Sequence, residues 1–72
     1  MSRIVAIGEE TELAGNALAG AAVVVAGDAE SVRRAWSELG GEVGLVLLTA
    51  QARRALPDPP DRTGLLWVVL PT

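Results

Sequence analysis

The side chains in this chain that could do chemistry are mainly carboxylates, and three of them lie close together near the N-terminus. Glu9, Glu10 and Glu12 directly follow the first apolar segment. Paired carboxylates can act as general acid and base or hold a divalent cation. Histidine, lysine, cysteine and tyrosine do not occur anywhere in the 72 residues. Ser-His, Cys-His and Ser-Lys catalytic pairs are therefore impossible, and the usual zinc ligands are missing.

The acidic group can be interpreted in two ways. Doubly wound sheets bind ligands beyond the carboxyl ends of their strands, and receiver domains of response regulators carry acids after the first strand as a metal site. A receiver domain also needs a phospho-accepting Asp after its third strand and a Lys, whereas this chain has Leu48-Thr49 there and no lysine. Acidic side chains also favour the positive end of a helix. We therefore expect charges that stabilise a helix start, with no catalytic residues, no metal and no cofactor.

Composition excludes several other classes of partner. The formal net charge is −3, from nine acidic and six basic residues, whereas a nucleic-acid surface needs clustered basic side chains. No G-x-G-x-x-G or G-x-x-x-x-G-K motif is present. The longest apolar stretch is far below the roughly 18 residues of a membrane span. We expect no nucleic-acid partner and no direct membrane insertion, and the absence of cysteine favours the cytoplasm.

Four short apolar segments alternate with helix-like segments along the chain, which predicts one domain over residues 1–72. The strands are predicted at residues 3–7, 21–26, 44–48 and 65–70. The helices are predicted at residues 11–19, around residues 32–39 with Asp28 or Ser31 as the cap, and at residues 50–56 with Thr49 as the cap. The fold class is therefore a small α/β domain with a parallel four-stranded sheet, order 2-1-3-4, and helices on both faces.

One face of this predicted sheet lacks cover. Right-handed crossovers place the first helix on one face and the other two helices on the opposite face. The first helix is short and rich in Ala and Gly, whereas the strands are apolar throughout, which is typical of burial on both faces. Leu47→Asp is accordingly expected to unfold the chain. Burying a few hundred Å² of apolar sheet would stabilise by several kcal/mol at about 25 cal/mol per Å². We expect another chain to supply that cover, unless the bare face is smaller and is simply tolerated.

Both tryptophans are candidates for interface anchors, because Trp is enriched at binding hot spots. Trp36 falls in the helical stripe of Val32, Ala35 and Leu39, which favours a place in the core. Trp67 lies on a predicted edge strand, where core and interface roles are equally supported. The proline-rich segment at residues 57–61 is interpreted as a connector.

Four segments together resemble the F subunit family of the V/A-type (vacuolar/archaeal-type) rotary ATPases. They are IVAIGEE at residues 4–10, GNALAG at 15–20, GLVLLT at 44–49 and LWVVLP at 66–71. In that family the first strand ends in Gly plus an acid, and the first helix ends in Leu-Ala-Gly. The third strand runs into Thr, and the fourth ends in Pro. Each pattern is weak by itself, but their order and spacing match over nearly the whole chain.

The resemblance implies a flavodoxin-like or Rossmann-like fold and a non-catalytic component of the central stalk. Such a component binds the coiled coil of the D subunit and works with the other rotary ATPase subunits to couple ATP hydrolysis or synthesis to ion transport. It implies a cytoplasmic location, peripheral to a membrane-bound complex. Family members usually carry a C-terminal helical tail, so this chain is expected to be a short form. An acid common in the last strand is replaced here by Trp67-Val68-Val69.

We expect partner contacts through exposed edges and loops rather than through a pocket. The candidate interface residues are Glu9, Glu10, Thr49, Gln51, Trp67 and Val69. Two other classes stay open. The first is a stand-alone domain that binds a small ligand in the crevice between the first and third strands. The second is a self-associating domain that buries its bare face in a homodimer when isolated.

Overall fold

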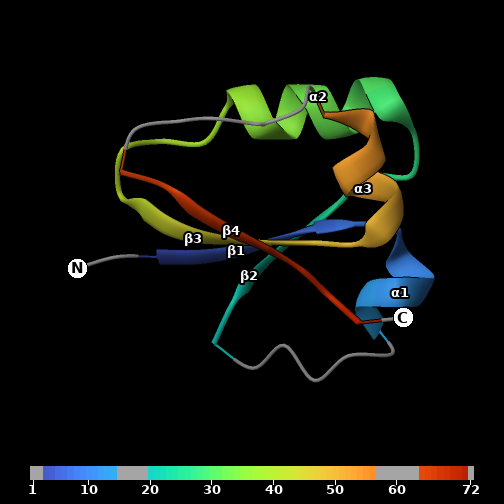
Figure 1. The fold of residues 1–72 in the computed structure, drawn as a ribbon, viewed down its shortest axis with the longest axis horizontal. Coiled ribbons are helices and arrows are strands. Elements are labelled where there is room, and N and C mark those ends of the chain that lie inside the picture. Colours follow the sequence, from blue (N-terminus) through green and yellow to red (C-terminus); the bar gives the residue numbers. More distant parts are fainter. Residues whose placement is uncertain (1–2, 15–19, 57–63, 72) are drawn as a thin grey trace.

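The computed structural model describes residues 3–14, 20–56 and 64–71. Within these ranges strands and helices alternate along the chain (Figure 1). They are β1 (Arg3–Gly8), α1 (Glu10–Ala14), β2 (Ala22–Val25), α2 (Ala29–Ser37), β3 (Val43–Leu48), α3 (Ala50–Ala55) and β4 (Leu66–Val69). All strand pairs are parallel, and their order is β2-β1-β3-β4. The predicted fold class is confirmed.

The elements begin and end close to where the sequence placed them. Helix α2 begins at Ala29, which agrees with Asp28, rather than Ser31, as its cap. Asp28 explains this start, because its extended backbone and its carboxylate cap the helix by accepting a hydrogen bond of 2.7 Å from the Ser31 amide. Two predictions, the later part of the first helix at residues 15–19 and the proline-rich connector, lie outside the described residues.

The helices divide between the two sheet faces as expected. Figure 1 shows α2 and α3 on one side of the sheet and α1 on the other. The connections β2 to β3 and β3 to β4 cross the sheet in one direction, whereas β1 to β2 crosses in the opposite direction. Of the three described helices, right-handed crossovers therefore put α1 on one face and the other two on the opposite face.

The main core lies between the sheet and the pair α2 and α3. Strand side chains on that side contact apolar side chains from both helices. Trp36 is among these helix side chains, as its place in the apolar stripe predicted. The buried members are Val5, Ile7, Ala26, Val32, Trp36, Val43, Val46, Leu48, Ala52 and Leu56. We call this side of the sheet the covered face.

The register of the parallel strands identifies which residues share the opposite side. Residues paired in register point to the same side, and successive residues alternate. Ala6 pairs with Val23 and with Leu47, and Leu47 pairs with Val68. We call this side the open face, and its residues are Ile4, Ala6, Val23, Val25, Leu45, Leu47, Leu66 and Val68.

Side-chain exposure differs sharply between the two faces. Ile7, Val46 and Leu48, on the covered face, are fully buried. On the open face Leu66 is 71% exposed and Val68 is 50% exposed. Within the described residues one face is therefore poorly covered, as the sequence predicted, and its exposure is greatest on the edge strands β2 and β4. Leu47 is half-buried on the open face, so a charge at this position does not test a doubly buried strand.

Candidate functional site

The carboxyl ends of β1 and β3 meet at the centre of the sheet, where ligands bind in many doubly wound folds. The amide of Thr49, directly after β3, donates a 3.2 Å hydrogen bond to the carbonyl of Ile7 in β1. The Thr49 hydroxyl donates to the Glu9 carboxylate and accepts a 3.2 Å bond from the Ala52 amide at the start of α3. One side chain therefore caps α3 and holds the segment that leads into α1.

Gly8 allows this close approach. A Cβ atom built on Gly8 would lie 2.6 Å from the Thr49 hydroxyl oxygen and 2.8 Å from the Thr49 Cβ. Real Cβ atoms essentially never come so near other heavy atoms, and Thr49 is only 2% exposed and so has little room to move. The Gly-acid pair after β1 and the Thr after β3 are therefore linked by packing as well as by the hydrogen bond.

A third loop joins the same end of the sheet. The Gln51 side-chain amide, on α3, donates a 3.3 Å hydrogen bond to the carbonyl of Gly27, which follows β2. We call Gly8, Glu9, Gly27, Thr49 and Gln51 the strand-end cluster. Its polar groups bind one another rather than pointing together into a cavity, and the two hollows that border the described residues lie elsewhere.

The predicted contact residues from the strand ends do lie together, but they are not equally accessible. Glu10 and Gln51 are exposed, and Glu9 is half-buried against Thr49. The prediction that Thr49 contacts a partner needs correction, because this buried side chain offers almost no surface. Sequence reasoning predicted the capping role of Thr49 but not its bond to Glu9 or its burial.

The other two predicted contacts, Trp67 and Val69, lie on β4 and belong to the covered face. Trp67 is half-buried beside the core, with the Arg53 guanidinium 4.9 Å from the centre of its ring. A cation–π contact at such a position is worth about 0.5–1 kcal/mol. Val69 pairs with Leu48 and is partly exposed at the sheet edge. Trp67 therefore has an internal partner in α3, whereas Val69 lies at the same end of the sheet as the strand-end cluster, opposite the last residue of β3.

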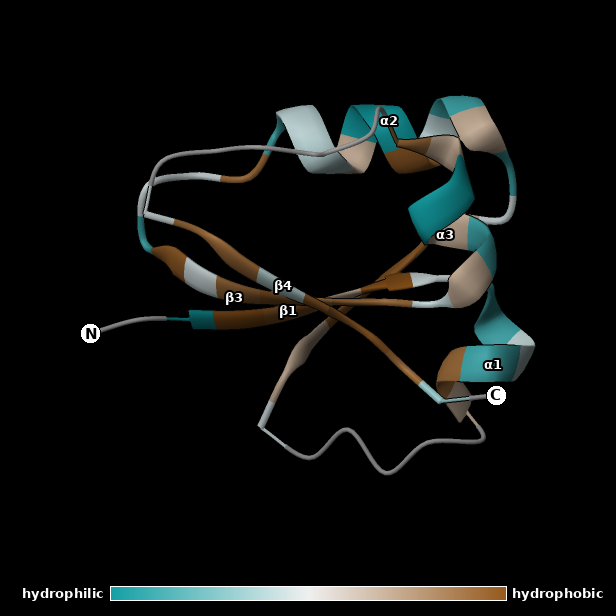
Figure 2. Ribbon diagram, in the orientation of Figure 1, coloured by the Kyte–Doolittle hydropathy of each residue, from teal (hydrophilic) through white to brown (hydrophobic). Residues whose placement is uncertain are grey.

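The open face is the apolar surface that sequence reasoning left without named residues. Figure 2 shows apolar residues along the strands, whereas hydrophilic and apolar residues are mixed along α2 and α3. Single exposed apolar residues are normal, but a contiguous set on a sheet face is typical of an interaction site. The strands are apolar at successive positions, so the sequence offered no alternation that could have identified these residues.

Two hollows border the sheet in the part of the chain that the structure describes. The smaller, about 210 Å³, lies between α1 and β2 and is lined by Glu10, Leu13, Ala14, Val23 and Val25. Its one charged lining residue is acidic.

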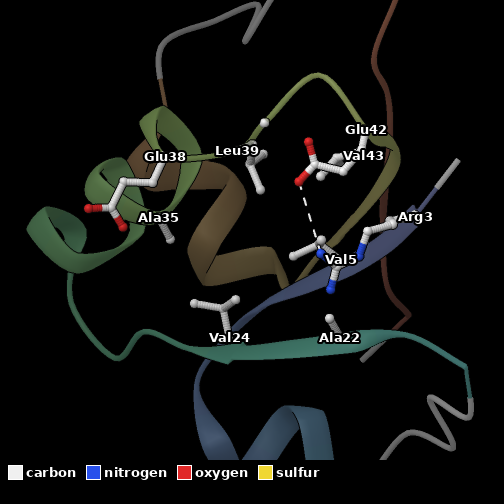
Figure 3. Close-up of a pocket in the computed structure, with 10 residues that line it drawn as sticks. Arg3, Val5, Ala22, Val24, Ala35, Glu38, Leu39, Glu42 and Val43 are labelled. Atoms are coloured by element: carbon white, nitrogen blue, oxygen red, sulfur yellow. Dashed lines mark ion pairs between the residues drawn. The ribbon is translucent and has the colours of Figure 1, made fainter.

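The larger hollow, about 260 Å³, lies between the end of α2 and the starts of β1 and β2 (Figure 3). Ala35 and Leu39 form its helix side, and an ion pair of 4.0 Å between Arg3 and Glu42 lies at its rim. Both charged side chains are more than half exposed, so this pair contributes little. The hollow offers no convergent set of polar groups for a particular ligand.

The electrostatics of the described residues do not indicate a reactive centre. The clear pKa displacement is at Asp28, whose pKa lies below its ordinary 3.8, mainly because the Ser31 amide donates to the carboxylate. The Ser31 hydroxyl and the charges of Arg34 and Arg33 act in the same direction. No described group of three His, Cys, Asp or Glu residues could hold a metal ion. None of the helices within the described ranges has the length and apolar character needed to span a bilayer.

Comparisons with protein-family models, curated proteins and solved structures found no match to this sequence. A functional proposal therefore depends on the chain's own residues, on their geometry, and on the resemblance of four segments to the F subunit family.

Proposed function

We propose that this chain is a non-catalytic interaction protein of the central stalk, equivalent to the F subunit of a V/A-type rotary ATPase. In this proposal it binds the coiled coil of the D subunit, on the cytoplasmic side of a membrane-bound complex. It helps to couple ATP hydrolysis or synthesis to ion transport. The observation that carries the proposal is the open face, an apolar sheet surface that the described helices leave exposed.

The segments behind the resemblance have coherent structural places, which supports the proposal. IVAIGEE forms β1 and leads into α1, GLVLLT forms most of β3 and ends at Thr49, and LWVVLP contains β4. The first two meet in the strand-end cluster through the bond between Thr49 and Glu9. Of GNALAG, Gly20 lies within the described residues, and its φ of +87° explains the need for glycine at the end of that segment.

The alternative of a stand-alone ligand-binding domain has less support. Its expected site was the crevice between β1 and β3, which the strand-end cluster fills with internal contacts. The lack of His, Lys, Cys and Tyr also favours a non-catalytic role. No observation on the described surface favours one small-molecule class.

Co-expression with the D subunit coiled coil from the same organism tests the proposal. We expect the two chains to purify together through a tag on either one and to sediment as a single complex. An unrelated two-stranded coiled coil of similar length and charge is the matched control. Separate elution of the chain and the coiled coil at micromolar concentration would contradict the proposal.

Self-association is the second candidate function, because the open face would also be buried in a symmetric dimer. Sedimentation equilibrium of the isolated chain distinguishes the two candidates. A monomer across the accessible concentration range contradicts the dimer. A tight dimer that does not exchange with the D subunit coiled coil favours self-association over the stalk role.

A further inference from the structure

We propose that a hydrogen-bond relay through Thr49 couples the start of α1 to the start of α3, two helices that lie on opposite faces of the sheet (Figure 1). The relay consists of the Ala52 amide, the Thr49 hydroxyl and the Glu9 carboxylate. It lets a change at one face of the sheet reach a helix on the other. This inference concerns the chain by itself and goes beyond the proposed function.

The relay runs in one direction through a single hydroxyl group. The Ala52 amide donates a 3.2 Å hydrogen bond to the Thr49 oxygen, and the Thr49 hydroxyl donates its proton to Glu9. Hydrogen bonds in series polarise one another, so a hydroxyl that donates to a carboxylate is itself a better acceptor. Glu9 therefore strengthens the cap of a helix that follows it by 40 residues in sequence.

The position of Thr49 makes the bond to Glu9 difficult to replace. The Thr49 side chain is 2% exposed, and its amide holds it to the Ile7 carbonyl at 3.2 Å. The close contact with Gly8 leaves it little room to move. A buried donor that loses its acceptor costs free energy unless water can reach it. Water reaches the Thr49 hydroxyl when the first turn of α3 opens, so loss of the Glu9 carboxylate favours that opening.

Helix α3 is short enough to respond to this change. It spans Ala50–Ala55, and helices of this length are not stable without outside support. Its first turn depends on Thr49 twice, because the Thr49 carbonyl accepts a 2.9 Å bond from the Arg53 amide in addition to the cap at Ala52. The two states of the relay are therefore a capped and an open start of α3.

The other end of the relay belongs to α1. The Glu9 carbonyl accepts a 3.1 Å hydrogen bond from the Leu13 amide, while the Glu9 side chain accepts from Thr49. One residue thus supports the first turn of α1 through its backbone and the cap of α3 through its carboxylate. Coupling between two sites is reciprocal, so loss of the Thr49 hydroxyl should loosen α1 as well.

Amide exchange of the full chain, followed residue by residue by NMR, tests the coupling. We expect Glu9→Ala to speed exchange at the Ala52 amide about threefold to tenfold relative to the amides of β1, which is the effect of one hydrogen bond. Glu10→Ala is the matched control, because it removes a neighbouring acid that is exposed and lies within α1. It should change Ala52 exchange by less than about twofold. Equal effects of the two variants would overturn the relay.

A conservative variant separates the hydrogen bond from the charge. Glu9→Gln keeps an oxygen that can accept from Thr49 but has no charge, so it should retain most of the protection at Ala52. If Glu9→Gln and Glu9→Ala were equally harmful, the effect would belong to the negative charge beside the helix start, and the relay would be overturned.

The Thr49 variants test whether the effect passes through the hydroxyl. In a Thr49→Val background, Glu9→Ala should produce no further increase in exchange at Ala52. Thr49→Val should also speed exchange at the Leu13 amide of α1, whereas Thr49→Ser, which keeps the hydroxyl, should not. A further increase as large as that in wild type, or unchanged Leu13 exchange in Thr49→Val, would overturn the relay. A melting curve for each variant verifies folding.

The outcomes are independent of the proposed function, because every measurement uses the isolated chain. Loss of the relay would leave binding to the D subunit coiled coil as it stands. Failure to bind that coiled coil would leave the relay in place.

Discussion

The two faces of this sheet are made from the same apolar strands, yet one is closed and the other is open. On the covered face Ile7, Val46 and Leu48 are fully buried beneath α2 and α3. On the open face Leu66 and Val68 are at least half exposed, and among the described helices α1 (Glu10–Ala14) is the one on that side. The difference shows that strand hydropathy reports the capacity for burial, whereas the number and length of the helices decide which face is buried.

The largest expected effect is the difference between two variants that place a charge near the end of β3, one on the covered face and one on the open face. Leu48→Asp puts a carboxylate without a partner into the main core, at a cost above the few kcal/mol that a domain of this size retains, so we expect no cooperative melting transition. Leu47→Asp points to the open face and should leave a folded chain with a lower melting temperature. Circular dichroism melts of the two variants measure the difference. Equal unfolding of both would mean that the open face is as closed as the covered one.

The next effect tests the close contact between Gly8 and Thr49 at the carboxyl ends of β1 and β3. Gly8→Ala places a methyl group against the buried Thr49 side chain, and overpacking of this kind costs about 1–3 kcal/mol. Chemical denaturation measures the loss. Gly27→Ala is the matched control, because a Cβ there meets no atom within 4 Å. A loss at Gly8 no larger than the change at Gly27 would show that the Thr49 contact does not set the requirement for glycine at Gly8.

Much of the fold could be predicted because local and global signals agree. The alternation of apolar runs with helical segments determined a parallel sheet, and right-handed crossovers then divided the helices between the faces. Asp28 and Thr49 were foreseen as caps because each precedes a helix with free amides. The stripe containing Trp36 identified the inner side of α2.

The residues of the site were harder to predict, for a physical reason. Continuous apolar strands such as 44–48 carry no alternation, so the sequence does not say which of Leu47 and Leu48 meets the helices. The burial of Thr49 depends on Glu9, which lies 40 residues away in sequence, and no local pattern reports that contact. The sequence favoured neither a core role nor an interface role for Trp67. The contact of its ring with Arg53 of α3 depends on the tertiary fold, which the sequence does not report locally.

A smaller loss is expected when the Thr49 hydroxyl is removed without changing the shape of the side chain. Thr49→Val loses the cap of α3 and the bond to Glu9, which together should cost about 1–2 kcal/mol of unfolding free energy. Thr49→Ser keeps the hydroxyl and is the matched control. Because α3 helps to close the covered face, the valine variant should also show faster amide exchange in α3 than in β1. Unchanged exchange in α3 would contradict the capping role.

The smallest effect is a pH dependence at the start of α2, the other helix of the covered face. The folded pKa of Asp28 lies below 3.8 because the Ser31 amide donates to the ionised carboxylate. The ionised cap therefore stabilises the fold above the unfolded pKa, and this stabilisation disappears as the pH falls through the folded pKa.

Asp28→Asn keeps a capping oxygen but does not titrate, so it is the variant to compare. The melting temperature of wild type minus that of Asp28→Asn should be constant from neutral pH to about pH 5 and should then decline below about pH 4. The other carboxylates are the same in both proteins, so their contribution cancels in this difference. A difference that stays flat into strong acid would show that the charge of Asp28 does not support α2, and that the covered face owes its closure to apolar packing alone.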